Sequence, residues 1–168
     1  MSPPLVVVTG APGAGKTTLA RALARELSLP LLAKDDVKEA LFDALGHGDV
    51  TRSNELGAAS FEVLFRVAAR LLENGVGCIV EGNFSRPEPF AVLPQARVVQ
   101  VLCRTEHAAE RYAQRARHPG HVDQARAAEV RTRIEAGEWH ALDLGGELIE
   151  VDTSAPVDVP ALAARILG

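Results

Sequence analysis

Sulfur, aromatic residues and long apolar stretches are all scarce in this 168-residue chain. Its two cysteines, Cys78 and Cys103, each lie inside an apolar run, so we expect reduced thiols packed as small hydrophobic side chains. The Cys/His spacing of a zinc site is missing. No apolar run approaches the roughly 20 residues that span a bilayer, and no charged-then-apolar leader opens the sequence. We therefore expect a cytoplasmic protein that makes no membrane contact.

The chain also lacks an excess of positive charge. The formal net charge is −4 at pH 7, which argues against a protein that holds nucleic acid through a broad positive field, although a local basic groove is still allowed. Hydrophobic residues make up 47% of the chain and charged residues 24%, which is an ordinary globular composition. We expect a single domain over residues 1–168, with no obligate protein partner.

What the chain does contain is a glycine-rich loop that matches the pattern G-x-x-x-x-G-K-[ST] at every fixed position. An apolar run at 5–8 precedes the loop and a helical pattern at 18–27 follows it, which disfavours an accidental glycine-rich turn. Such a loop turns backbone N–H groups inward and cradles phosphates at a helix N-terminus. Lys16 would reach the β- and γ-phosphates, and the Thr17 hydroxyl would bind Mg²⁺. The expected nucleotide-binding residues here are Gly10, Ala11, Pro12, Gly13, Ala14, Gly15, Lys16, Thr17 and Thr18.

Strand and helix patterns alternate along the whole chain. Apolar runs predict strands at 5–8, 31–33, 77–81, 97–103 and 148–151. Helical spacing predicts helices at 18–27, 37–45, 123–136 and 156–167, a long helix that opens at Ser53 or Asn54, and a helix that Thr105 caps and that runs to about Arg117. This alternation predicts an α/β fold in three layers, with a five-stranded parallel sheet covered by helices on both faces. Such sheets bind ligands at the carboxyl ends of their strands.

Two carboxylates follow strands at that edge. Asp35 comes just after the second predicted strand, in place to accept the proton of an acceptor hydroxyl during phosphoryl transfer. Alternatively, Asp35 or its neighbour Asp36 simply caps the next helix. Glu81 ends the third strand and would hold Mg²⁺ through water, unless it is only a solvated carboxylate. Asn83 would bind the acceptor or orient Asp35, or it belongs to an ordinary turn.

Arginines gather further along the chain, at Arg104, Arg111, Arg115 and Arg117. Arg111 and Arg115 are four residues apart and would share a helix face, and Pro119-Gly120 follows. This pattern predicts a lid around residues 111–123 that closes over phosphates, although a solvated helix face would look similar. His118 flanks the turn and would contact substrate. Thr153 lies in a loop that we expect near the nucleotide base, and Arg111 would stack on the other side of that base. Alternatively, Thr153 caps the last helix.

The glycine loop, Lys34–Lys38, Glu81–Phe84 and the arginine-rich flap together resemble a family of small P-loop kinases. These AAA-type ATP-binding proteins include polynucleotide 5′-hydroxyl kinases, zeta toxins and chloramphenicol phosphotransferases. The resemblance implies the three-layer P-loop NTPase fold, ATP and Mg²⁺ as cofactors, Asp35 as general base, and Arg115 or Arg111 as the flap arginine. It also puts Lys38 where the polynucleotide kinases carry an arginine that contacts the acceptor's phosphate. A lysine at this position cannot bind a phosphate through two parallel hydrogen bonds, as an arginine can. Together with the acidic net charge, this difference favours a small-molecule acceptor.

The sequence thus predicts an ATP- and Mg²⁺-dependent kinase that transfers the γ-phosphoryl group to a hydroxyl of a small molecule, such as a sugar, nucleoside or antibiotic. The expected catalytic residues are Lys16, Asp35, Arg111 and Arg115, and the expected substrate contacts are Asp36, Lys38, Glu81, Asn83, Arg117 and His118. Two alternatives stay open, namely a polynucleotide 5′-hydroxyl kinase and a regulatory ATPase without an acceptor. A GTPase switch is disfavoured because the chain contains no Asn-Lys-x-Asp motif.

Overall fold

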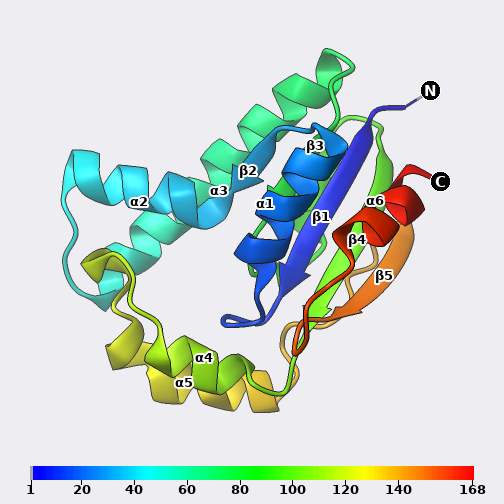
Figure 1. Ribbon diagram of the computed structural model, residues 1–168. Helices are drawn as coiled ribbons and strands as arrows, with labels where there is room; N and C mark the ends of the chain where they lie inside the picture. Colours follow the sequence, from blue (N-terminus) through cyan, green and yellow to red (C-terminus); the bar gives the residue numbers. More distant parts are fainter. Residues whose placement is uncertain (1) are drawn as a thin grey trace.

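A five-stranded parallel sheet forms the centre of the molecule, and the computed structural model describes residues 2–168 of the chain (Figure 1). The strands pair in the order β2-β3-β1-β4-β5, so the first strand lies in the middle. Their bounds are Pro4–Gly10 for β1, Leu31–Ala33 for β2, Cys78–Glu81 for β3, Arg97–Arg104 for β4 and Glu147–Asp152 for β5. All five predicted strands are confirmed, with bounds that move by one or two residues at most.

Helices cover both faces of this sheet and give the expected three layers (Figure 1). They are α1 at Lys16–Leu27, α2 at Lys34–Leu45, α3 at Val50–Glu73, α4 at Ala108–Gln114, α5 at Asp123–Glu135 and α6 at Val159–Leu167. Two 3₁₀ turns, η1 at Glu88–Val92 and η2 at Pro119–His121, complete the chain. No helix within residues 2–168 is long and apolar enough to cross a membrane.

The apolar run in β1 divides its side chains between two cores. Val6 and Val8 pack with α1 and α6 on one face, whereas Leu5 and Val7 pack with α3 on the other. Because helices bury both faces, the strand is apolar throughout instead of alternating with polar residues. This burial holds the sheet in place under the loop that follows Gly10.

Helix α2 begins earlier than the sequence pattern suggests. It starts at Lys34, directly after β2, and Ala33 occupies its N-cap position. Asp35 and Asp36 therefore lie inside the first turn and do not cap the helix, which corrects the capping alternative. The strand runs straight into the helix, so neither carboxylate has the non-helical backbone that a cap needs. Their charges still favour this position because a helix N-terminus is partly positive.

Helix α3 also starts before the expected Ser53 or Asn54. Asp49 is its cap, and the Asp49 carboxylate accepts a hydrogen bond from the Arg52 backbone N–H at 3.0 Å. Ser53 is completely buried and lies one turn inside the helix. Its hydroxyl is thereby free to bond a side chain from another helix instead of its own backbone.

Helix α4 is shorter than predicted at both ends. The Thr105 hydroxyl accepts from the His107 N–H at 3.2 Å in the turn before the helix, and the helix ends at Gln114. Arg115 already has extended backbone, with φ −73° and ψ 140°. The prediction that Arg111 and Arg115 share a helix face is therefore wrong. Figure 1 shows α4 and α5 beyond the arrowheads of the strands, at the carboxyl edge of the sheet.

Candidate active site

The loop between β1 and α1 has the shape that phosphate binding requires. Gly13 has a φ of +86°, and a Cβ at this residue would lie 2.1 Å from the carbonyl oxygen of Ala108. Only glycine fits such a conformation at such a close approach. The loop leads into α1 at Lys16, where the first backbone N–H groups of the helix point toward an anion.

Lys16 is buried beside this loop, and its ammonium donates to the Ala11 carbonyl oxygen at 2.8 Å. Burial lowers the pKa of Lys16, although the nearby Glu81 carboxylate opposes the shift. The Thr153 hydroxyl donates to the Ala14 carbonyl oxygen at 2.8 Å, and the Arg111 guanidinium donates to the Thr153 carbonyl oxygen at 3.1 Å. Thr153 thus braces the loop from the end of β5, and Arg111 is anchored beside it.

Thr17 and Glu81 form a hydroxyl–carboxylate pair next to the loop. The Thr17 hydroxyl donates to Glu81 Oε2 at 3.2 Å, and Glu81 is only 3% exposed. Burial raises the pKa of Glu81, and Lys16 opposes the shift. Hard oxygen donors of this kind fit Mg²⁺, which keeps several waters and shares phosphate oxygens instead of filling an all-protein cage. Residues 2–168 contain no group of three or more His, Cys, Asp or Glu side chains that could hold a metal ion.

Asp35 projects from the first turn of α2 and is held by two cations. Its Oδ1 lies 3.2 Å from the Lys34 ammonium, and its Oδ2 accepts from the Arg117 guanidinium. Burial alone would raise the pKa of Asp35, but the attraction of Lys34 and Arg117 outweighs it and holds the pKa below the usual range. The side chain is therefore a carboxylate at neutral pH. Each oxygen keeps a second lone pair that can accept from a hydroxyl group.

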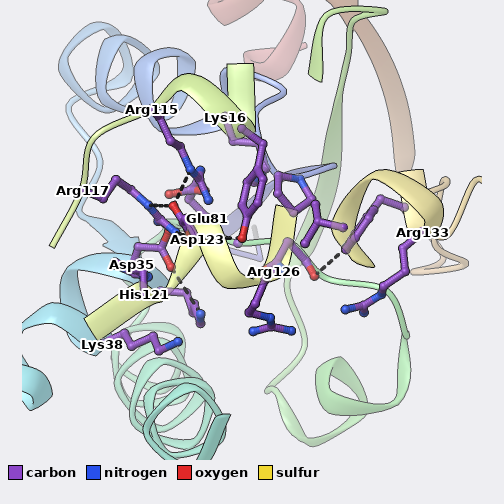
Figure 2. A pocket seen from close by; sticks show the side chains of 17 residues that line it. Lys16, Asp35, Lys38, Glu81, Arg115, Arg117, His121, Asp123, Arg126 and Arg133 are labelled. Carbon is purple, nitrogen blue, oxygen red and sulfur yellow. Dashed lines mark hydrogen bonds and ion pairs between the residues drawn. The ribbon is translucent and has the colours of Figure 1, made fainter. Parts of the chain in front are cut away.

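Asp123, the first residue of α5, ties the basic segment together (Figure 2). It accepts from Arg115 Nε at 2.8 Å, from Arg117 Nε at 2.9 Å and from the Tyr112 hydroxyl at 3.0 Å. Burial would raise the pKa of Asp123, but hydrogen bonds from Arg117 lower it to about 2. One carboxylate thus orients two arginines of the predicted lid, a role that the sequence analysis missed.

A cavity lies between α2 and α5 beside these residues, and Figure 2 shows the side chains that line it. We call it the cationic pocket because seven lysines and arginines face it, against three carboxylates. It is lined by Pro12, Lys16, Lys34, Asp35, Lys38, Glu81, Gly82, Asn83, Tyr112, Arg115, Arg117, His121, Asp123, Arg126, Val130, Arg133 and Trp139.

Several residues of the cationic pocket were not among the expected site residues. Arg126 and Arg133 are seven residues apart on α5, two turns of one helix face, and Lys34 and Lys38 are four apart on α2. The helix predicted at 123–136 already holds Arg126 and Arg133 at this spacing. Lys34 was missed because α2 was expected to begin at residue 37, so it was not placed on one helix face with the predicted substrate residue Lys38. Trp139 is 9% exposed, and its Nε1 donates to the Asn83 carbonyl oxygen at 3.2 Å, so it packs at the pocket edge beside a predicted substrate residue.

Two predicted substrate residues lie outside the cationic pocket and outside the cavity at the phosphate loop, which is described below. Asp36 is exposed and pairs with Arg21 at 3.3 Å, because its position in α2 turns it away from Asp35. His118 pairs with Asp43 at 3.1 Å and stacks on Phe42, with ring centroids 5.2 Å apart. Both residues help to hold the surroundings of the site rather than face it. His121 takes the position toward the pocket that was expected of His118.

The cavity at the phosphate loop and the cationic pocket share part of their walls. The former is lined by Gly13, Gly15, Lys16, Thr17, Thr18, Asp35, Glu81, Arg111 and Arg115. Four of these side chains also line the cationic pocket, namely Lys16, Asp35, Glu81 and Arg115. A group bound at the loop would therefore meet a molecule in the pocket at the Asp35 carboxylate.

Comparison with known proteins agrees with this geometry. A family model described as AAA domain (AAA_33) matches residues 5–136. The chain belongs to this family. The matched part runs from β1 through α5, so it takes in the phosphate loop, Asp35, Glu81 and the arginine-rich segment.

Individual relatives point the same way. A shikimate kinase of Corynebacterium glutamicum is 32% identical over 118 residues, which cover 69% of this chain and 68% of that protein. A structure described as a "putative kinase" from Chloroflexus aurantiacus superposes with a TM-score of 0.85 at 38% identity, over 99% of this chain and 98% of the other. A sugar kinase of Janibacter sp. HTCC2649 shares the fold, with a TM-score of 0.60 at 20% identity over 99% and 93% of the two chains. The expectation of a small P-loop kinase, a phosphotransferase acting on a hydroxyl acceptor, is confirmed.

Proposed function

We propose that this protein transfers the γ-phosphoryl group of ATP to a hydroxyl group of a small molecule, with Asp35 as the general base. The observation that carries the proposal is the shared wall of the two cavities, because Asp35 faces both the phosphate loop and the cationic pocket. The kinase relatives support a small-molecule acceptor, and the net charge of −4 disfavours a long nucleic acid.

Each residue of the shared wall has a chemical task in this scheme. Asp35 accepts the proton of the acceptor hydroxyl, and Lys16 neutralises charge on the phosphates. Arg111 and Arg115 stabilise the charge that develops on the transferred group. P-loop kinases in general use Mg²⁺, which here would be held by Thr17 and, through water, by Glu81 and would neutralise phosphate charge.

We further propose that residues 1–168 act as one domain in which the 111–123 segment is a lid. In the structure this segment is docked on α2 through the Arg117–Asp35 and His121–Glu39 pairs, the latter at 2.8 Å. Gly120 lies against Phe42 of α2, where a Cβ would come within 2.6 Å of the ring. Opening these contacts admits the acceptor, and closing them excludes water from the reacting groups.

An acceptor screen with γ-labelled ATP and Mg²⁺ tests the proposal. Shikimate, sugars, nucleosides, aminoglycosides, chloramphenicol and 5′-hydroxyl oligonucleotides are offered separately, beside a reaction without any acceptor. We expect label on one class of small molecule, and faster ATP turnover when that class is present. Label on the oligonucleotides alone would instead establish a polynucleotide kinase. Steady hydrolysis that no acceptor alters would favour a regulatory ATPase and remove the role of Asp35 as base.

A further inference from the structure

The charges that face the cationic pocket do not all have partners. Lys34 and Arg117 are balanced by Asp35 and Asp123, and Arg133 pairs with Glu138 beside the pocket. Lys16 lies beside the Glu81 carboxylate. Arg115 also pairs with Asp123, at 2.8 Å. Of the two cations left, Lys38 has no carboxylate within salt-bridge distance among the described residues, and Arg126 has only a contact of 3.5 Å with Glu129. A buried positive charge without a counter-ion costs free energy, so the excess calls for a ligand of opposite sign.

Lys38 is buried and has a neutral hydrogen-bond partner. It is 4% exposed, and its ammonium donates to the Ser53 hydroxyl at 2.8 Å, which carries no charge. A Cβ on Gly57 would lie 3.6 Å from the Lys38 ammonium nitrogen and 4.0 Å from that of Lys34, so the two ammonium groups lie close together over α3. Lys34 has Asp35 as its partner. Within residues 2–168, no carboxylate lies within salt-bridge distance of Lys38.

Arg126 faces the same end of the pocket from α5. Its Nη1 donates to the Asn54 side-chain oxygen at 3.2 Å, and its one carboxylate contact, with Glu129, is 3.5 Å long. Its Nε is buried and has no hydrogen-bond partner among the described residues. Because Ser53 and Asn54 are consecutive in α3, one turn of that helix holds both cations at the same place. Figure 2 shows Lys38 and Arg126 at the end of the pocket away from Lys16.

We infer that the acceptor carries an acidic group, a carboxylate or a phosphate, which binds between Lys38 and Arg126 while its hydroxyl group faces Asp35. The inference rests on the proposed function for the hydroxyl. For the acid it rests on Lys38, which has no carboxylate partner among the described residues, and on Arg126, whose one carboxylate contact is 3.5 Å long. An acidic group would accept from the guanidinium group of Arg126 and from the Lys38 ammonium, which both line the pocket. Both are charge-assisted hydrogen bonds, the stronger kind in proteins.

Binding is measured first, without any chemistry. Trp139 is the only tryptophan of the chain and lines the cationic pocket, so its fluorescence reports on this cavity. The phosphate loop is filled with ADP and Mg²⁺ beforehand, and matched pairs are titrated, namely gluconate against glucitol, glucose 6-phosphate against glucose, and shikimate against its methyl ester. We expect saturable changes with acids and none with their neutral partners. Equal binding of a neutral partner, or no saturable change with any acid, would overturn the inference.

Variants then test whether Lys38 and Arg126, and not other cations of the surface, bind the acid. Lys38→Met and Arg126→Gln are each expected to weaken binding of the acid by at least about tenfold, while ADP binding stays the same. Lys38→Arg should restore most of the affinity. Arg131→Gln removes an exposed arginine of the same helix outside the pocket and should change affinity less than about twofold. Unchanged acid binding in both Lys38→Met and Arg126→Gln contradicts the assignment.

Phosphoryl transfer to the same compounds distinguishes this inference from the proposed function. If neutral compounds receive label as readily as acids, the kinase assignment stands and the acidic subsite is wrong. If acids bind through Lys38 and Arg126 but no acceptor receives label, the subsite stands and the kinase assignment fails. Carboxylate and phosphate members of the panel show which acid the pocket prefers.

Discussion

The phosphate loop and the cationic pocket share one wall, yet they are built from different parts of the protein. The loop consists of consecutive residues and offers backbone N–H groups at the start of α1. The pocket collects side chains from α2, β3, the segment after α4, and α5. A phosphate is recognised in nearly the same way by every such loop, whereas side chains brought together from distant positions can be exchanged singly. In the proposed function, nucleotide binding therefore depends on the loop and acceptor choice on the pocket.

Replacement of Gly13 by alanine should have the largest effect, because it disrupts the phosphate loop, which binds through its backbone N–H groups. The new Cβ would come within 2.1 Å of the Ala108 carbonyl oxygen at a φ of +86°. We expect loss of ADP binding and of phosphoryl transfer, measured by calorimetry and label transfer. Gly75→Ala is the control, since Gly75 has a φ of +74° but open space around it and should cost only about 1–2 kcal/mol of stability. Wild-type ADP affinity in Gly13→Ala would contradict the close packing of the loop.

Asp35→Asn tests the wall that the two regions share. The amide cannot take up the acceptor's proton, so kcat should fall by about 10²–10⁴-fold while ADP affinity stays near the wild-type value. Asp36→Asn is a matched control, because Asp36 is the next residue in the same helical turn but is exposed and paired with Arg21. We therefore expect Asp36→Asn to retain activity. Equal losses in the two variants would show that the first turn of α2 matters only for structure.

Asp123→Asn should have an intermediate effect. It tests the cationic pocket, which is built from side chains. The neutral side chain loses its ion pairs with Arg115 and Arg117, so Arg115 loses its orientation at the phosphate-loop cavity and Arg117 its orientation toward Asp35. We expect kcat to fall by up to about 100-fold with little change in the KM for ATP. Asp43→Asn, which removes the exposed partner of His118, is the control and should be nearly neutral. A pure rise in the ATP KM would argue against a positioning role for Asp123.

The smallest expected effect is a pH dependence of acceptor binding, which arises in the cationic pocket and not at the phosphate loop. Burial, reinforced by Lys34 and also by Arg126 and Arg117, lowers the pKa of Lys38 to about 8, against the opposing attraction of Asp35. Lys38 therefore carries its charge below pH 8 and loses it above. The KM of an acidic acceptor should rise about tenfold from pH 7 to pH 9. In Lys38→Arg the charge persists and this rise should vanish; an equal rise in that variant contradicts the prediction.

Much of the fold could be read from the sequence because parallel strands buried on both faces leave continuous apolar runs. All five strands were found in this way. Helix ends were harder. Helix α4 was expected to continue to Arg117, but ion pairs with Asp123, eight residues beyond Arg115, draw the arginines out of the helix. Tertiary contacts of this kind leave no local pattern, so the lid arginines were predicted but their common partner was not.

The sequence by itself determined the phosphate loop, the order of strands and helices, and the placing of Asp35 and Glu81 at strand ends. These features depend on backbone sterics and on apolar spacing, both of which act between near neighbours along the chain. Only the tertiary structure decided that Asp36 and His118 lie outside the site, and that Lys38 and Arg126 meet at one turn of α3. Such a meeting depends on how three helices pack around the sheet, because Lys38 and Arg126 are 88 residues apart in the chain.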